Sequence, residues 1–229
     1  MNTEIELKFL VLNKDITEPT ADKITKLLKE KKYNFVCHER DLINSYFDTP
    51  DLQLRQLDMG LRVRKSIDTL GVYALEQTIK TSGKVMGGLH QRPEFNVDID
   101  TNFPVLSQFP QAIWPDNKNI EILQKQLTSL FSTNFKRLFW HITIEGVNGQ
   151  QSEIELVFDQ GIIETHGEQE SLCEIELELV SGSLSDLLML AKVLCFGLQI
   201  RPGIKSKAAR GYALWQNGIA KINVNTEKD

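Results

Sequence analysis

The sequence predicts an α+β fold in which eight antiparallel strands close into a β-barrel, a tunnel with a polar, charged lumen and helices packed on its outside. Three observations support this prediction. Eight segments alternate apolar and polar residues, as half-buried strands do. Hairpin-like connections join several of them, which favours antiparallel pairing. Amphipathic helical segments lie between and after the strands, and they need an apolar surface to cover.

The predicted strands follow from the alternation of residue types. The stretch NTEIELKF places Glu4, Glu6 and Lys8 on one side and apolar residues on the other. The stretches FDTPD, KTSGK and GVNGQ supply turns. Strands are predicted at 2–9, 37–47, 60–67, 72–81, 89–99, 135–145, 152–159 and 172–180.

The predicted helices follow from apolar residues at helical spacing. The segment 16–33 contains the helix-start residues Thr17, Pro19 and Thr20, and Ser183 is the expected N-cap of a helix within 181–200. Further helical segments are 105–114, 119–131 and 206–216. We expect one domain over 1–216, followed by a polar C-terminal tail, 217–229, that frays.

Composition narrows the class of protein. The 229 residues carry a formal net charge of −5, which argues against a nucleic-acid partner. No stretch of about 18 apolar residues and no secretory signal is visible, so we expect no membrane partner. Three scattered cysteines suggest a reducing compartment, and the four histidines lack metal-ligand spacing. A cytoplasmic location is therefore expected, whereas the oligomeric state stays open.

The charged faces of the strands are sorted by sign. Carboxylates gather on the first strand and the last two, whereas Arg and Lys gather on the middle strands. An ordinary solvated face, the alternative interpretation, usually intersperses the two signs. If helices cover the apolar outer face, the charges must point into the lumen. The acidic set is Glu4, Glu6, Glu153, Glu155, Asp159, Glu174, Glu176 and Glu178; the basic set is Arg62, Arg64, Lys80, Arg92 and Arg137.

A charged lumen indicates a charged ligand, because buried charges are costly unless they are paired or neutralised. Arg offers a rigid fork of donors that matches phosphate oxygens. Glu carboxylates are ligands that Mg²⁺ or Mn²⁺ prefers. Lys205, Lys207 and Arg210 lie near the start of the last helix, where basic residues are unfavourable unless an anion is present. The two sets together predict a metal-bound polyphosphate.

The stretches EIELK, QRPEFNV, CEIELEL and SKAARGY, in this order, resemble the CYTH family, the triphosphate tunnel metalloenzymes. The resemblance spans about residues 2–215 and is closest to bacterial inorganic triphosphatases. It implies an eight-stranded antiparallel tunnel that hydrolyses or cyclises triphosphate compounds with a divalent metal. The expected activity is hydrolysis of inorganic triphosphate to pyrophosphate and phosphate with Mg²⁺, or Mn²⁺, as cofactor.

The resemblance also assigns expected roles to residues. Glu4, Glu6 and Lys8 are the expected catalytic residues, and Glu94 is expected to orient a neighbouring Arg or hold water. The expected metal ligands are Glu4, Glu6, Glu155, Glu174, Glu176 and Glu178. The expected substrate-binding residues are Lys8, Arg62, Arg64, Lys80, Arg92, Arg137, Lys205, Lys207 and Arg210.

Several alternatives stay open. Within the same family they are a thiamine triphosphatase, a nucleoside triphosphatase and an adenylate cyclase, each of which needs a lining for an organic ring. From a different class, the protein could be a non-catalytic polyphosphate-binding module. The many carboxylates argue against such a module, because an anion-binding protein gains nothing from them unless a metal is present.

Overall fold

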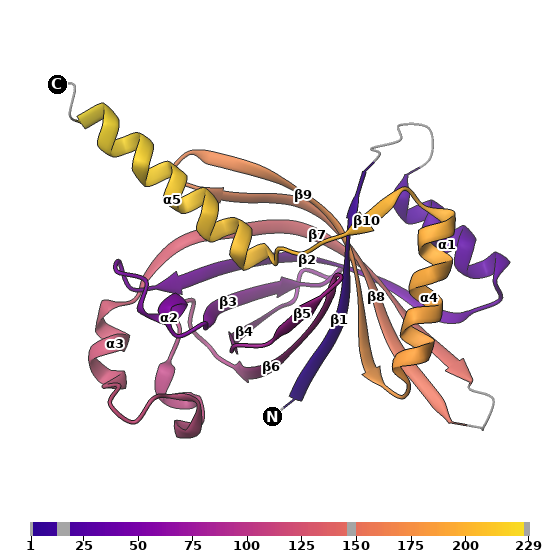
Figure 1. Ribbon diagram of the computed structural model, residues 1–229, viewed down its shortest axis with the longest axis horizontal. Coiled ribbons are helices and arrows are strands. Elements are labelled where there is room, and N and C mark those ends of the chain that lie inside the picture. Colours follow the sequence, from indigo (N-terminus) through magenta and orange to yellow (C-terminus); the bar gives the residue numbers. More distant parts are fainter. Residues whose placement is uncertain (1, 13–18, 146–149, 227–229) are drawn as a thin grey trace.

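A computed structural model describes residues 2–12, 19–145 and 150–226 of the chain (Figure 1). Ten strands form one antiparallel sheet. The strands are β1 Asn2–Val11, β2 Asn34–Asp48, β3 Gly60–Ile67, β4 Tyr73–Lys80, β5 Lys84–Met86, β6 Leu89–Asp98, β7 Thr128–Glu145, β8 Gln151–Thr165, β9 Glu168–Ser181 and β10 Ile200–Pro202. The helices are α1 Thr20–Glu30, α2 Gln53–Gln56, α3 Ile120–Gln126, α4 Leu184–Gly197 and α5 Lys207–Thr226, with 3₁₀ turns η1 Leu106–Gln108 and η2 Gln111–Ile113.

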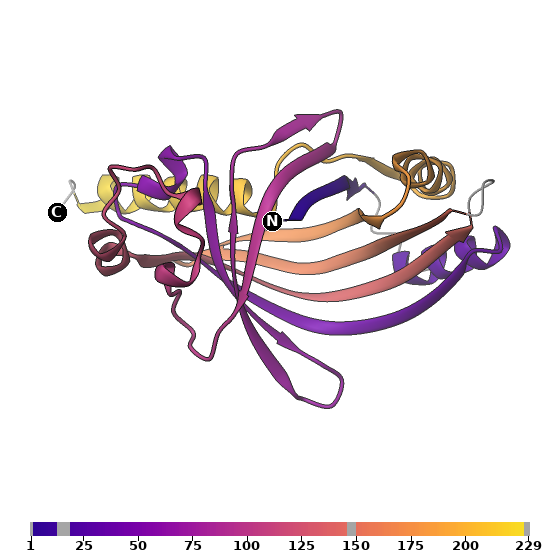
Figure 2. The same cartoon turned by 90° about the horizontal axis from the view of Figure 1, so that it is seen from below.

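Eight of the strands close into a ring. They follow one another in the order β1, β9, β8, β7, β2, β3, β4 and β6, and β6 pairs again with β1. Strands β5 and β10 add to β6 and β1 outside this cycle. Strands β2, β7, β8 and β9 are 14 to 18 residues long, whereas β3, β4 and β6 have 8 to 10. The long strands therefore curve past the short ones, and the ring is not a regular barrel (Figure 2).

Apolar side chains on the outer face of the ring form two cores. The larger one packs α1 and α4 against β1, β7, β8 and β9, with Leu28, Trp140 and Leu190 fully buried. The second covers β2, β3 and β4 with α2, α3 and the 3₁₀ turns, around Leu61, Ile79 and Leu106. Both cores confirm that helical segments cover the apolar outer face.

Helix α5 departs from the predicted arrangement. Its Tyr212 packs against Phe131 and Ile163, which point to the same side of β7 and β8 as Arg137 and Asp159. Helix α5 thus lies on the inner face of the long strands, and the prediction that all helices pack outside is wrong for it. The reason lies in β7 and β8, whose inward positions change from charged residues, Arg137 and Asp159, to apolar residues, Phe131 and Ile163. Helix α5 covers these apolar residues.

Several element boundaries differ from the prediction. The segment 119–131 is helical only to Gln126, because β7 begins at Thr128, and 105–114 forms only the two 3₁₀ turns. Ser183 caps α4 as predicted, its hydroxyl accepting from the Ser185 N–H. Helix α5 continues through 217–226, which the sequence pattern assigns to a tail; 227–229 lie outside the described residues, as does most of the GVNGQ turn. No described helix is long and apolar enough to cross a bilayer.

Candidate active site

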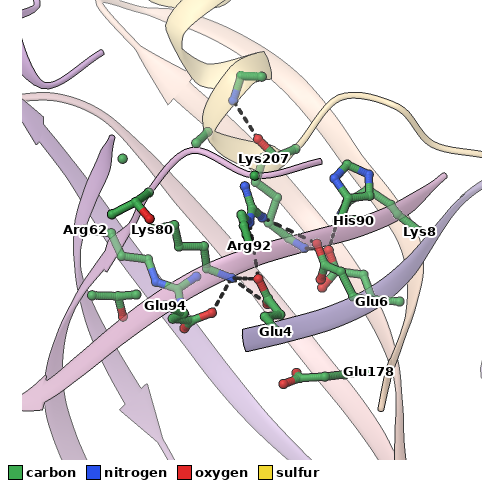
Figure 3. A pocket seen from close by; sticks show the side chains of 18 of the residues that line it. Glu4, Glu6, Lys8, Arg62, Lys80, His90, Arg92, Glu94, Glu178 and Lys207 are labelled. Atoms are coloured by element: carbon green, nitrogen blue, oxygen red, sulfur yellow. Dashed lines mark hydrogen bonds and ion pairs between the residues drawn. The ribbon is translucent and has the colours of Figure 1, made fainter. Parts of the chain in front are cut away.

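The ring encloses a cavity of about 640 Å³ with a charged lining (Figure 3). Alternation along β1 points Glu4, Glu6 and Lys8 inward, where they are almost completely buried. The lining includes most of the residues singled out in the sequence: Glu4, Glu6, Lys8, Arg62, Arg64, Lys80, Arg92, Arg137, Glu155, Glu176, Glu178 and Lys207. The predicted sorting of charged faces into the lumen is therefore confirmed.

One group of charges joins β1 to β3, β4 and β6. The Lys80 ammonium lies 2.6 Å from Glu4 Oε1 and 2.7 Å from Glu94 Oε2. Arg92 donates to Glu4 at 3.2 Å and to Glu6 at 3.4 Å. Burial would raise the pKa of Glu94, but Lys80 and Arg62 outweigh it and lower this pKa to about 2. Glu94 thus lies within ion-pair distance of both Lys80 and Arg62.

A second group joins β7, β8 and β9 to α5. Arg137 donates to both oxygens of Asp159, at 2.7 and 2.8 Å, and Lys207 lies 2.7 Å from the same carboxylate. Lys207 also contacts Glu174 and, at 3.0 Å, Glu176. Burial alone would raise the pKa of Asp159, yet the two cations hold it well below its usual range. Lys8 pairs with Glu174 and Glu176 as well, so this group is neutralised within the protein.

Arg62 and Arg64 are less completely neutralised. Burial and the guanidinium groups of Arg62 and Arg137 lower the pKa of Arg64 to about 9, and its Nε donates to Asn44 at 2.8 Å. The nearest carboxylate of Arg62 is Glu94, at 3.6 Å, and its buried Nε has no hydrogen-bond partner among the described residues. A buried donor without a partner is costly. These two arginines therefore offer donors to an anion in the cavity.

Three carboxylates lie side by side on neighbouring strands. The pairing register places Glu178 of β9 opposite both Glu6 of β1 and Glu155 of β8. Like charges in such positions destabilise a sheet. Burial, together with the carboxylates of Glu4 and Glu155, raises the pKa of Glu178 to about 7. The row Glu6, Glu178 and Glu155 is thus an excess of negative charge that a divalent cation would relieve, and its oxygen donors fit Mg²⁺ or Mn²⁺.

A further carboxylate group, formed by Asp159, Glu174 and Glu176, has the spacing of metal ligands. Their oxygens lie within 4.8 Å of one another. Lys8, Arg137 and Lys207 already occupy the positions between them. Among the described residues this group is the only set of three carboxylates with that spacing, so the oxygens of Glu6, Glu178 and Glu155 lie farther apart. The row differs in another respect, because cations balance the buried group more completely than they balance Glu178.

The structure separates three predicted residues from the cavity. Lys205 is exposed and does not line it. Arg210 binds Glu170 at 2.7 Å and Glu174 at 3.1 Å, and neither Arg210 nor Glu174 reaches the lining. Asp159 belongs to the acidic set predicted from the sequence, but neither it nor His90 has a predicted role in the site. Both residues share the parity of inward-facing neighbours, Asp159 that of Glu155 and His90 that of Arg92, and this parity is the available signal. The structure shows His90 buried beside Gly203.

Comparisons with known proteins agree with this geometry. The model of the CYTH domain matches residues 2–212. An inorganic triphosphatase of Haemophilus influenzae is 37% identical over 185 residues, 80% of this chain and 49% of that protein. This chain thus spans about half the length of that relative. A ring of antiparallel strands with a charged interior defines the class, and the chain belongs to the CYTH family.

Solved structures share the fold. A Hippeastrum protein described as a putative adenylyl cyclase with a dominant triphosphatase activity superposes with a TM-score of 0.59, at 18% identity, over 94% of this chain and 96% of that one. A Pyrococcus horikoshii protein gives a TM-score of 0.53, at 18% identity, over 89% and 94%. At this level of identity the likeness concerns the fold alone.

Proposed function

We propose that this protein hydrolyses inorganic triphosphate to pyrophosphate and phosphate with the help of a divalent metal. The observation that carries the proposal is the cavity, in which incompletely neutralised arginines face a row of carboxylates. The named activity of the Haemophilus influenzae relative supports the same substrate.

The basic wall would bind and orient the substrate. Arg62 and Arg64 would donate to phosphate oxygens and stabilise the charge that develops on the leaving pyrophosphate. Lys80 and Arg92, now held by Glu4, would contact the phosphates from the neighbouring strands. Phosphoryl transfer depends mainly on such positioning and charge neutralisation.

The acidic wall would hold the metal and the attacking water. Glu6, Glu178 and Glu155, with Glu4 beside them, would bind Mg²⁺ or Mn²⁺. Such an ion, when bound, neutralises phosphate charge and makes bound water more acidic. A carboxylate of this row would accept the proton of the attacking water. Lys8, between Glu174 and Glu176, would keep a positive charge at the junction of the two walls.

The lining favours bare triphosphate over substrates with an organic ring. Its aromatic residues are Tyr46 and Tyr212, and these are only 5% and 2% exposed. The described part of the lining therefore presents no open ring face on which a base could stack.

The test is phosphate release from inorganic triphosphate by the purified chain, with Mg²⁺ and with a chelator, beside ATP and thiamine triphosphate. We expect Mg²⁺-dependent release with triphosphate preferred. Glu4→Gln and Glu6→Gln should each reduce turnover at least about 100-fold, because removal of a group that acts on a reacting centre usually lowers the rate by that much. Glu39→Gln, on an exposed carboxylate, is the matched control. Full turnover in both lumen variants would refute the assignment.

A further inference from the structure

Arg55 lines the same cavity but belongs to neither charged wall described above. It is exposed, and it lies in the short helix α2, at the end of the ring where Met59, Ser206 and Tyr212 also contribute to the lining. The first turns of α5 lie beside α2 there (Figure 1). Arg55 thus marks a mouth of the cavity.

The ring of Tyr212 supports the guanidinium of Arg55. The guanidinium lies over this ring, 4.6 Å from the centroid. The Tyr212 hydroxyl donates to Asp48 Oδ2 at 3.0 Å, and the same oxygen accepts the backbone N–H of Arg55 at 3.0 Å. Asp48 is completely buried. One carboxylate therefore fixes both the helix that carries Arg55 and the ring that supports it.

The charge of Arg55 is not neutralised in the protein. Across the described ranges, 2–12, 19–145 and 150–221, no carboxylate forms an ion pair with its guanidinium, although Asp58 lines the same mouth. Its planar fork of donors remains available to a ligand at the rim.

Arg55 continues the basic wall. Arg62 pairs in register with Tyr46, and Tyr46 packs in one cluster with Tyr212, over which Arg55 lies. Neighbouring strands of the ring therefore carry Arg92, Lys80 and Arg62 in turn, and Arg55 lies next to the Arg62 end of this series. A linear anion that fills the ring and extends toward this mouth would reach Arg55 with its next charged group.

We propose that Arg55 binds the phosphate group that follows the third in a linear inorganic polyphosphate, so that the cavity takes tetraphosphate in addition to triphosphate. This inference rests on the proposed function for the placement of the first three phosphates. It assigns Arg55 as a determinant of chain length, since a bare triphosphate held by Arg62, Arg64 and Lys80 does not need the rim.

The experiment measures dissociation constants for inorganic triphosphate and tetraphosphate by calorimetry in the presence of a chelator, and kcat/KM for both with Mg²⁺. The preference is the ratio of the tetraphosphate value to the triphosphate value, taken for the association constant or for kcat/KM, and Arg55→Gln should lower this ratio about tenfold, which corresponds to about 1.4 kcal/mol. The matched control is Arg40→Gln. Arg40 is also exposed and also lies over an aromatic ring, Phe139 at 5.5 Å, but it does not line the cavity, so its variant should keep the preference.

An unchanged preference in Arg55→Gln, or an equal loss for both substrates, would overturn the inference. If Arg55→Gln lowers the melting temperature, Arg55→Lys serves as the test, because Lys keeps the positive charge but lacks the planar fork of donors. The inference then requires that Arg55→Lys lower the preference for tetraphosphate relative to triphosphate. Failure of the proposed function would appear differently, as an absence of Mg²⁺-dependent phosphate release by the wild-type protein. The dissociation constants measured with the chelator would still test the role of Arg55.

Discussion

Single residues in the lumen differ in whether their charge is balanced. Asp159 is enclosed by Arg137 and Lys207, whereas Glu178 lies between two other carboxylates. The first arrangement stabilises the ionised carboxylate and the second penalises it. These opposite environments lead to opposite effects of the same type of substitution, carboxylate to amide.

Asp159→Asn should destabilise the protein by roughly 3 kcal/mol, because removal of one partner leaves buried cations without compensation. Urea unfolding at neutral pH measures this change. Glu39→Gln, which breaks an exposed ion pair with Lys136, should change the free energy of unfolding by less than about 1 kcal/mol. Equal effects of the two variants would mean that Asp159 is not a buried charge partner.

Glu178→Gln should stabilise the metal-free protein at pH 8 and leave its stability unchanged near pH 4. The pKa of Glu178 in the folded protein, about 7, lies above the ordinary value of 4.5. The contribution of this side chain to stability is therefore complete below pH 4.5 and is lost as the pH rises through about 7. The gain at pH 8 is roughly 1–3 kcal/mol. Urea unfolding with a chelator at both pH values measures it; a gain that is equal at both would contradict the assigned pKa.

At the scale of elements, α5 depends on a close approach to the sheet. Gly211 faces Phe131, and a Cβ atom there would come within 2.0 Å of the ring. Gly218, two turns later, has no heavy atom closer than 3.6 Å to the corresponding position. The same helix therefore contains one glycine that packing requires and one that it does not.

Gly211→Ala should destabilise the protein by about 1–3 kcal/mol through overpacking. It should also lower turnover, because displacement of α5 moves Lys207 away from Asp159 and Glu174. Gly218→Ala should stabilise by roughly 0.5–1 kcal/mol, since Ala is the better helix former. Melting temperatures by circular dichroism measure both effects. A stabilised Gly211→Ala would show that α5 does not pack as described.

Most strands could be predicted from alternation, but their lengths could not. The strand predicted at 60–67 coincides with β3, whereas β8 and β9 continue around a tight turn at His166 and Gly167, both at positive φ. The helix predicted at 119–131 extends past the observed end of α3 because Leu127, Leu130 and Phe131 fit both a helical and a strand pattern. Tertiary pairing with β2 selects the strand.

At the scale of the whole molecule, closure of the ring creates the site. Glu6, Glu155 and Glu178 come from β1, β8 and β9, and they meet only when these strands pair. The unfolded chain has no equivalent arrangement. Metal binding should therefore be coupled to folding.

Mg²⁺ should raise the melting temperature of the wild-type protein by several degrees, since 1 kcal/mol corresponds to about 2–4 °C in a domain of this size. Glu178→Gln should lose most of this shift because it removes one carboxylate of the row, whereas Glu39→Gln should retain it. Thermal denaturation with Mg²⁺ and with a chelator measures the shift. Identical melting temperatures in the two conditions would rule out a metal site in the row.

The sequence by itself determined the alternating strands, the sorting of charge by strand and the resemblance to a family, because each depends on local spacing or on short motifs. Only the tertiary structure decided which charges meet. Lys207 lies against Asp159 because α5 packs inside the long strands, and Glu178 lies between Glu6 and Glu155 because of the pairing register. Both arrangements depend on contacts between residues far apart in the chain, which local patterns do not encode.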